Sequence, residues 1–406
     1  MSEGDEVVSE SDEAVSEGDE AASESDEAFS EGDEAMADAP PGPLRRGWTT
    51  GTCAAAATRA AYELLVTGEC PATVEVGLPS GARVAFSVAS FETGSDGATA
   101  GVVKDAGDDP DVTHGAIVKA KVIAGAPGSG VIFRAGEGVG TVTKPGLPIP
   151  PGEPAINPVP RQMIRQAVRE AVTHFSATGD VVVEISIPGG AAMAEKTLNG
   201  RLGIVGGLSI LGTTGIVVPY SCAAWIHSIH RGIDVARATG LAHVAGATGS
   251  TSEGAVQKLF GLPEAALIDM GDFVGGMLKY LKRHPVARVT IAGGFAKMVK
   301  LGQGLLDLHS KRGEVDRDWL ARLMVNAGAP AALASFAGSA NTAQLVLEEA
   351  RSAGFPLGDL VAEAAWQTAA RALDGTGITL DVAVFDRAGC LAGQAQARLA
   401  HAPLPR

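Results

Sequence analysis

The sequence predicts an α/β fold, with an α+β domain in its N-terminal half and a Rossmann-like, three-layer α/β domain in its C-terminal half. Two patterns carry this prediction. In the C-terminal half, short apolar runs alternate with helical segments, as they do in parallel β-α-β units. In the N-terminal half, several strand-like runs lie between two helical segments. The chain has 406 residues, which is enough for two domains that each bury a core.

The N-terminal half is expected to begin its fold with an alanine-rich helix at residues 52–66. Threonines precede this segment as candidate N-caps, and Gly68 follows it as a candidate C-cap. A second helix is expected after a proline-rich stretch, because apolar residues recur on one helical face from Ile164 to Phe175. Strands are expected at residues 73–78, 83–88, 116–123, 130–134 and 181–187.

The C-terminal half is expected to form an open parallel sheet, with ligands at the carboxyl ends of its strands. Strands are expected at residues 241–247, 265–270, 286–292 and 379–385, with a last short strand after a turn at residues 386–389. Helices are expected at residues 253–260, 272–283 and 342–352, the last after an Asn341 cap. The chain is thereby divided into a tail at residues 1–43, an α+β domain at residues 44–240 and a Rossmann-like domain at residues 241–406.

The N-terminal tail consists of near-repeats of a seven-residue acidic unit and is expected to be disordered. Its apolar residues are adjacent to one another, which does not match the a and d positions of a coiled coil. It is either an acidic interaction arm or a solvated extension. Of the 47 acidic residues, 16 lie in residues 1–38, so the rest of the chain carries 31 acidic residues against 32 basic ones. A nearly neutral folded part argues against nucleic-acid binding, which depends on a basic surface.

The cysteines and the hydropathy pattern indicate a cytoplasmic protein. The four cysteines are widely spaced and form no C-x-x-C pair, which favours reduced thiols over a zinc site or a disulfide framework. No apolar run reaches the ~18 residues that a membrane helix needs, and the acidic N-terminus is unlike a signal peptide. We therefore expect neither export nor membrane insertion.

The first candidate site lies at the start of the first helix. Arg45 and Arg46 precede Thr49 and Thr50 at this helix N-terminus. A helix N-terminus binds anions because its free N–H groups and the helix dipole act together. The threonines could also serve as caps of the helix, which does not exclude an anion site.

The second candidate site is an acidic loop. Asp105, Asp108, Asp109 and Asp111 lie within seven residues, and His114 follows three residues later. Carboxylates and a histidine at this density could supply a general base, orient a ligand or bind a hard cation. The spacing fits no calcium-loop template, and the same residue types are common in turns. The residues alone leave these alternatives open.

Two glycine-rich segments, at residues 136–146 and 199–215, form the third and fourth candidate sites. The first contains G-x-G-x-G, but no helix follows it, so we interpret it as a glycine turn beside a ligand and not as a nucleotide loop. The second has six glycines within 16 positions among apolar residues. Its surface suits either a flat macrocycle or close packing of backbone against backbone.

The fifth candidate site follows the first strand of the C-terminal half. Gly249, Ser250 and Thr251 precede the next helix, and Asp269 ends the next strand about 20 residues later. Small residues beside a ligand and an acid for ribose hydroxyls are features of a Rossmann-like cofactor site, although G-x-G-x-x-G is missing. Gly293, at the end of the third strand, is expected to face the same crevice. The sequence contains neither a P-loop nor a nucleophile-elbow motif, which disfavours P-loop NTPases and α/β-hydrolases.

Together these motifs resemble those of the cobalt-precorrin-5B C(1)-methyltransferases of anaerobic cobalamin biosynthesis. The resemblance runs from Leu44 to the C-terminus and lies in six ordered segments, at residues 46–53, 104–111, 136–146, 152–160, 201–215 and 301–310. It implies transfer of a methyl group from S-adenosyl-L-methionine to ring carbon 1 of cobalt-precorrin-5B, giving cobalt-precorrin-6A. It also implies that cobalt enters only as part of the substrate, so no protein-bound metal is expected.

The resemblance also implies roles for the candidate residues. The substrate is a macrocycle with carboxylates at its rim, and the domain at residues 44–240 is expected to bind it. The expected substrate-binding residues are Arg46, Thr49, Thr50, Lys104, Glu137, Lys144 and Arg201. The candidate catalytic bases are Asp105, Asp108, Asp109 and His114. The expected cofactor-binding residues are Gly249, Ser250, Thr251, Asp269 and Gly293.

An alternative function is a non-catalytic tetrapyrrole-binding carrier. The sequence departs from the family pattern at Gly249-Ser250, where the family has Gly-Asn, and beside Gly293, where the family has Gly-His. Loss of the cofactor site with retention of the macrocycle surface would give such a carrier. The expected partner is in either case a small corrinoid, with neither nucleic acid nor membrane, and a homo-oligomer is compatible with the sequence.

Overall fold

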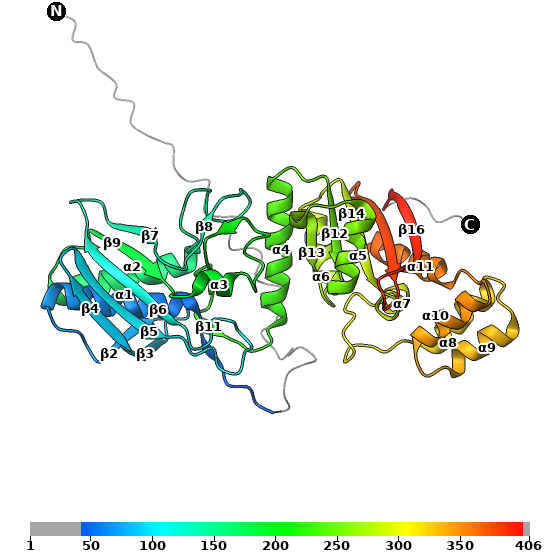
Figure 1. Cartoon of the computed structure of the whole chain (residues 1–406), viewed down its shortest axis with the longest axis horizontal. Helices are drawn as coiled ribbons and strands as arrows, with labels where there is room; N and C mark the ends of the chain where they lie inside the picture. The colour runs from blue at the N-terminus through cyan, green and yellow to red at the C-terminus, as the bar shows by residue number, and fades with distance from the viewer. Residues whose placement is uncertain (1–41, 401–406) are drawn as a thin grey trace, which may run out of the picture. The chain divides into compact units, whose positions relative to one another are not determined.

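The structure is a computed structural model that describes residues 42–400 (Figure 1). The prediction of a disordered acidic tail at residues 1–43 falls almost entirely outside the described residues. Within them, helices and strands alternate in a mixed pattern, with one five-stranded sheet in each half. The prediction of an α/β fold is therefore confirmed.

The sheet of the N-terminal half has the strand order β4-β5-β6-β9-β7. Neighbouring strands are antiparallel except that β7 runs parallel to β9. The strand bounds are β4 (Ser90–Gly94), β5 (Gly97–Val103), β6 (Ile117–Ala124), β7 (Val131–Ala135) and β9 (Val181–Ser186). A separate hairpin joins β2 (Thr73–Gly77) to β3 (Arg83–Ser87). The pair β4 and β5 was not predicted, because glycine and exposed polar residues dilute its alternation.

Two helices, α1 (Thr50–Thr67) and α2 (Pro158–Phe175), pack on each other, and α1 also packs on β5 and β6. The small side chains of α1 explain this close approach, because its alanines are almost all fully buried. The helix begins two residues before the predicted start. The hydroxyl of Thr49 caps it by accepting from the N–H of Thr52, and Gly68 ends it in the left-handed conformation as predicted.

The glycine-rich segments are held together by short strand pairs. β1 (Gly47–Trp48) pairs with β11 (Ile216–Val217), and β8 (Thr141–Val142) pairs with β10 (Ile204–Val205). The short helix α3 (Gly190–Ala194) lies between β9 and β10 in the sequence. A Cβ atom added at Gly190 or Gly207 would collide with the carbonyl oxygen of Gly138. These glycines therefore allow backbone to pack against backbone, one of the two alternatives that the sequence left open.

Helix α4 (Cys222–Ala238) was not predicted, although Ser221 caps it by accepting from the N–H of Ala224. It packs against α6 (Val274–Arg283), β13 (Leu267–Asp269) and the 3₁₀ helix η2 (Glu264–Ala266). Three of its buried side chains, Ile229, Ile233 and Ala236, belong to the hydrophobic cluster of the C-terminal half. The boundary at residues 240 and 241 stays a prediction, and this packing favours a boundary nearer to residue 221.

The sheet of the C-terminal half has the strand order β13-β12-β14-β15-β16. The first four strands are parallel, as predicted, and β16 is antiparallel to β15. The bounds are β12 (His243–Ala247), β13 (Leu267–Asp269), β14 (Arg288–Gly294), β15 (Thr379–Phe385) and β16 (Leu391–Leu399). Counted from β12, this is the doubly wound order 2-1-3-4-5, in which the winding direction reverses between β12 and β14.

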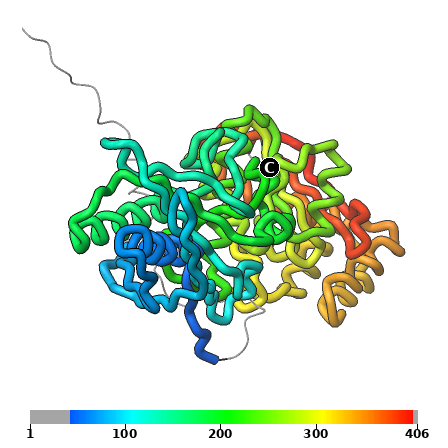
Figure 2. Tube along the Cα trace, turned by 60° about the vertical axis from the view of Figure 1, so that its left-hand side comes forward, coloured from blue at the N-terminus to red at the C-terminus, as the bar shows by residue number. Residues whose placement is uncertain are grey.

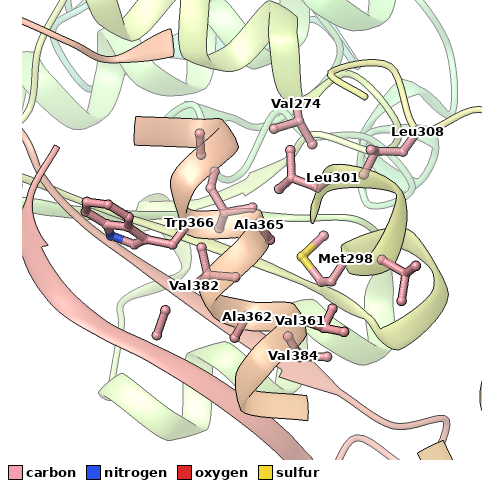
Figure 3. Packing of buried hydrophobic residues seen from close by; sticks show 14 of the residues in the cluster. Val274, Met298, Leu301, Leu308, Val361, Ala362, Ala365, Trp366, Val382 and Val384 are labelled. Carbon is pink, nitrogen blue, oxygen red and sulfur yellow. The ribbon is translucent and has the colours of Figure 1, made fainter. Parts of the chain in front are cut away.

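Helices cover both faces of this sheet. Helix α5 (Ser250–Phe260) packs on one face, over a cluster that includes Ala245 and Ala292. The opposite face is covered by α6 (Val274–Arg283), α7 (Phe295–Gly302) and α11 (Leu357–Ala372). Figure 3 shows part of this larger cluster, with Met298 and Leu301 of α7, Val361 and Trp366 of α11, and strand residue Val382. The result is the predicted three-layer arrangement.

Three further helices lie between α7 and α11, in the orange part of the trace in Figure 2. They are α8 (Arg317–Asn326), α9 (Ala331–Ser339) and α10 (Ala343–Ser352). Thr342, and not the predicted Asn341, caps α10 by accepting from the N–H of Leu345. Helix α10 packs against α7 and α11, so its N-terminus lies close to the sheet.

Candidate functional site

A cavity of about 430 Å³ lies at the carboxyl ends of β12, β14 and β15. This is the edge where the winding of the sheet reverses, the position at which doubly wound sheets bind ligands. The cavity is lined by Thr248, Gly249, Ser250, Thr251, Ser252, Gly294, Phe295, Ala296, Lys297, Thr342, Ala343, Gln344, Phe385, Asp386 and Arg387. All of them belong to the C-terminal half.

The cavity has the electrostatic character of a site for an anionic group. Helices α5, α7 and α10 all begin at its wall, so the positive ends of three helix dipoles are directed to one space. Lys297 and Arg387 add two cationic side chains. Lys297 is paired with Asp272, and its pKa is lowered by burial and then by the charge of nearby Lys300. A carboxylate or a phosphate is the kind of group that these features stabilise.

The predicted cofactor residues are only partly brought together here. Gly249, Ser250 and Thr251 line the cavity as expected. Gly293 lies one residue before the lining and is required for packing, because a Cβ atom there would crowd Met298 and Thr248. Asp269 is not among the lining residues, since β13 lies on the far side of β12 from β14.

Asp269 lies instead beside Arg201 and Glu253. Burial raises the pKa of Asp269, and the charge of Glu253 raises it further, against the opposing effect of Arg201. The backbone carbonyl of Asp269 accepts a hydrogen bond of 3.1 Å from the indole N–H of Trp225 in α4. A ribose-binding role for Asp269 stays a prediction.

Several cavity residues, among them Gln344 and Arg387, were missed by the sequence analysis. Arg387 could have been found, because the turn after a parallel strand reaches the same edge as the other strand ends. That turn is organised by Asp386, whose carboxylate accepts from the N–H groups of Ala388 and Cys390 and pairs with Arg351. Gln344 carries no signal in the sequence, because the placement of α10 depends on packing.

The acidic loop of the N-terminal half is an ordered network of hydrogen bonds. Asp105 pairs with Arg45 and accepts from the N–H of Gly107, and these contacts lower the pKa of its carboxyl group to about 2. The Nδ1 atom of His114 accepts from the N–H of Ala106 at 3.1 Å. Neutral His114 therefore carries its proton on Nε2, and its ring is exposed. In this state it presents a donor and not a base.

The neighbouring aspartates differ from Asp105. Asp108 is exposed and accepts from the backbone N–H of Arg45 at 2.6 Å. Asp109 is half-buried and accepts from the N–H of Tyr220 at 2.9 Å. Burial raises the pKa of Asp109, and the neighbouring Asp111 raises it further. Of the four predicted bases, Asp109 therefore has the carboxyl group best suited to accept a proton.

Several predicted substrate-binding residues are engaged within the protein. Thr49 and Thr50 are buried, and the Thr50 hydroxyl exchanges hydrogen bonds with the backbone of Leu211. Lys104 is 1% exposed and paired with Asp111. These three side chains are therefore poorly placed to reach a ligand, and their binding role stays a prediction.

The remaining substrate candidates are more accessible. Arg46 and Glu137 are exposed, and within residues 42–400 neither forms an ion pair. Lys144 is half-buried and donates to the carbonyl of Arg201 at 3.4 Å. The guanidinium group of Arg201 is directed to Glu253 of α5. Of these candidates, Lys144 lies beside Arg201, whereas no contact places Glu137 with Arg201 or with the acidic loop in the described residues.

The described residues include no group of three or more His, Cys, Asp or Glu side chains arranged to hold a metal ion. Among the same residues no helix is long and apolar enough to cross a membrane. The acidic loop satisfies its carboxylates with backbone N–H groups and cationic side chains, as a turn does.

The fold and the cavity define an α/β protein with a candidate small-molecule site at the carboxyl edge of a doubly wound sheet. Comparison with known proteins identifies the family. The model of the CbiD family matches residues 37–219, and the model of the CbiD C-terminal domain matches residues 307–396. The chain belongs to the CbiD family.

Curated relatives match over nearly their whole length. A cobalt-precorrin-5B C(1)-methyltransferase of Bradyrhizobium sp. is 69% identical over 90% of this chain and 96% of the relative. One of Agrobacterium fabrum is 62% identical over 89% of this chain and 96% of the relative. A crystal structure of the cobalamin biosynthesis protein CbiD from Archaeoglobus fulgidus is 31% identical, with a TM-score of 0.37 over 66% of this chain and 83% of the other.

Proposed function

We propose that this protein transfers a methyl group from S-adenosyl-L-methionine to C-1 of cobalt-precorrin-5B, giving cobalt-precorrin-6A in cobalamin biosynthesis. One observation carries the proposal: curated relatives with this activity in their names are 56–69% identical over at least 85% of the chain. The substrate is then a corrinoid, and cobalt belongs to that substrate. Because the pathway is biosynthetic and the described residues contain no membrane-spanning helix, we also propose a cytoplasmic location.

The cavity at the ends of β12, β14 and β15 is the proposed site of the methyl donor. S-Adenosyl-L-methionine carries a carboxylate and a cationic sulfonium. The helix N-termini, Lys297 and Arg387 favour the carboxylate and disfavour the sulfonium. The donor is therefore expected to bind with its methionine carboxylate in the cavity and its methyl group directed outward.

The methyl donor supplies an electrophilic methyl group, and the protein has to hold the accepting carbon in line with it. The C–S bond breaks as the new C–C bond forms, and S-adenosylhomocysteine leaves. A base is needed if the methylated ring then loses a proton. We propose Asp109, in the same loop as Asp105, Asp108 and His114, as this base.

The macrocycle and the methyl donor are proposed to bind to different domains, each of which contains one of the two five-stranded sheets. The macrocycle is bound by the domain at residues 44–240, where Arg46, Glu137 and Lys144 remain accessible. The donor is bound by the domain at residues 241–406. Within residues 199–215, Gly212 allows close approach to Thr49 and Gly203 allows close approach to Lys144, because an added Cβ atom at either glycine would collide with that side chain.

Mass spectrometry of cobalt-precorrin-5B incubated with the protein and a methyl donor labelled at the methyl group tests the proposal. A label on C-1 of the product is the expected result. Calorimetry with S-adenosylhomocysteine separates the enzyme from a carrier. Binding of the corrinoid without binding of S-adenosylhomocysteine would favour the non-catalytic carrier, and binding of a nucleotide phosphate in its place would favour a different enzyme.

A further inference from the structure

Arg201 forms the most completely bonded ion pair between the two halves of the described chain. Its two terminal nitrogens donate to the two carboxylate oxygens of Glu253 at 2.7 and 2.6 Å. Its Nε donates to Glu264 at 3.3 Å. The side chains of Arg201 and Glu253 are only 24% and 15% exposed. A two-point pair of this kind fixes orientation as well as distance.

The surroundings of Arg201 argue against a role as an anchor for a substrate carboxylate. One guanidinium faces the two carboxylates of Glu253 and Glu264, and Asp269 lies close enough for its pKa to respond to both Arg201 and Glu253. A further carboxylate would therefore meet net negative charge. It would also have to replace bonds that are already charge-assisted.

Each partner of the pair is attached to a different candidate site. Arg201 lies in the glycine-rich segment, where its carbonyl accepts from Lys144 and the next glycine, Gly203, packs against the Lys144 side chain. Glu253 is the fourth residue of α5, and the three residues before it line the cavity. Its N–H donates to the carbonyl of Gly249 at 2.9 Å. The ion pair therefore connects the glycine-rich segment at residues 199–215 to α5, the helix whose first three residues line the cavity.

We propose that Arg201 and Glu253 are positioning residues that couple the cavity to the glycine-rich segment at residues 199–215. This inference rests on the proposed function, which assigns the methyl donor to the cavity and the macrocycle to the N-terminal half. A ligand that orders residues 249–252 also fixes Glu253, and Glu253 then fixes Arg201. The donor and the macrocycle therefore bind with positive coupling, and the same factor applies in both directions.

The coupling is measured by calorimetry with S-adenosylhomocysteine and cobyrinic acid, a stable corrin with free carboxylates. Each ligand is titrated alone and in the presence of the other. For the unaltered protein we expect each ligand to tighten the other by at least about fivefold. In Arg201→Gln and Glu253→Gln the factor is expected to fall close to one, while S-adenosylhomocysteine alone binds within about threefold of its original affinity.

The exchanged pair Arg201→Glu/Glu253→Arg distinguishes positioning from anchoring. A positioning pair regains part of the coupling when its charges are exchanged, whereas a substrate anchor does not. Glu264→Gln is the matched control, because Glu264 is 68% exposed and makes only the single longer contact. It is expected to keep the coupling. Weak binding of cobyrinic acid alone in Arg201→Gln, with no recovery in the exchanged pair, would overturn the proposal.

Amide hydrogen exchange gives a readout that needs no ligand. Glu253→Gln is expected to speed exchange in residues 199–203 as well as in the first turn of α5. Faster exchange in α5 alone would refute the link between the two segments. Failure of the unaltered protein to bind S-adenosylhomocysteine, with exchange behaving as expected, would instead refute the assignment of the donor to the cavity.

Discussion

Lys104 and Asp111 form a buried ion pair in which the lysine side chain is 1% exposed and the aspartate side chain is 26% exposed. The carboxylate of Asp111 also accepts from the N–H and the hydroxyl of Thr113. Burial acts to raise the pKa of Asp111, but the charge of Lys104 and these hydrogen bonds outweigh burial and lower it. The two partners are therefore stabilised differently. Asp111 also accepts hydrogen bonds from Thr113 and is partly exposed to solvent, whereas Lys104 is almost completely buried.

Asp111→Asn is expected to destabilise the protein more than Lys104→Met. The first leaves a buried ammonium without its counter-charge, which costs about 3 kcal/mol. The second leaves a carboxylate that Thr113 and solvent still stabilise, and we expect a loss of about 1 kcal/mol. The measurement is the free energy of unfolding in urea at pH 7. Asp96→Asn at the exposed Lys121 pair is the control and is expected to cost less than about 1 kcal/mol.

The same variants test the substrate role of Lys104. Lys104→Met is expected to bind cobyrinic acid as well as the unaltered protein does, because the lysine is closed off from ligands. If Asp111→Asn and Lys104→Met lowered the free energy of unfolding by the same amount, the predicted difference between the two residues would be wrong. Loss of corrinoid binding in a folded Lys104→Met protein would restore Lys104 as a substrate-binding residue.

Stability is expected to fall as the pH is lowered from about 6.5 to about 4, in part because of His230. Its ring stacks on Tyr280 at 3.9 Å, and its pKa is lowered to about 4 by burial and then by His227, Arg231 and His284. Because the folded-state pKa is the lower one, the unfolded chain binds more protons in this window, so acid favours unfolding. The contribution of His230 is about 3 kcal/mol.

His230→Phe isolates this contribution, because phenylalanine keeps a stacked ring and cannot be protonated. Urea unfolding at pH 7, 5.5 and 4.5 is expected to give a flatter pH dependence for the variant than for the unaltered protein. His243 and His284 also have pKa values lowered mainly by burial, so some dependence remains. Parallel curves for the two proteins would show that His230 does not contribute.

Close backbone packing makes Gly358 in α11 a sensitive position. A Cβ atom there would collide with the carbonyl oxygen of Ala392 at the start of β16, and Gly393 faces Gly358 in return. We expect Gly358→Ala to cost about 3 kcal/mol or more, since backbone on both sides has to move. Gly254→Ala in α5 is the matched control, because nothing lies within 4 Å of its added Cβ and alanine favours a helix. Thermal unfolding of both variants is the measurement, and similar melting temperatures would contradict the prediction.

The regular parts of the fold were predictable because each has a local cause. The parallel strands β12, β14 and β15 are apolar runs separated by helical segments, and Thr49 and Gly68 are good caps for α1. Helix α4 was missed although its signals are local, with Ser221 as N-cap and Ile226, Ile229 and Ile233 on one helical face. Residues 249–251, which the sequence analysis predicted to bind a cofactor, line the cavity at the expected sheet edge, since the carboxyl ends of parallel strands meet there.

The site chemistry was less predictable because it depends on pairing across long sequence distances. Nothing local indicates that Lys104 is closed off or that Arg201 faces Glu253, 52 residues later. The distinction between Asp105 and Asp109 likewise comes from their partners, Arg45 for the first and Tyr220 for the second. The sequence groups these charged residues by their position in the chain, and the structure shows that their partners and their burial differ.

Asp109→Asn is expected to lower turnover by about 100-fold while leaving corrinoid affinity within about threefold. The amide keeps an acceptor for the N–H of Tyr220 and removes the capacity to take a proton. In the unaltered enzyme, turnover is expected to decline as the pH falls through the raised pKa of Asp109, and the variant should lack this decline. Steady-state kinetics between pH 5 and 8 checks both points, and normal turnover would remove Asp109 from the chemistry.

The four cysteines are expected to react with iodoacetamide at very different rates. Cys390 is exposed, whereas Cys53 is fully buried and burial raises its pKa to about 12. Cys70 and Cys222 are half-buried, and burial raises the pKa of each thiol. Because the thiolate is the reactive form, native protein at pH 8 should show one fast thiol by mass spectrometry, and Cys390→Ser should lose it. All four should react in urea. Fast labelling of Cys53 in the native protein would mean that α1 opens readily from its sheet.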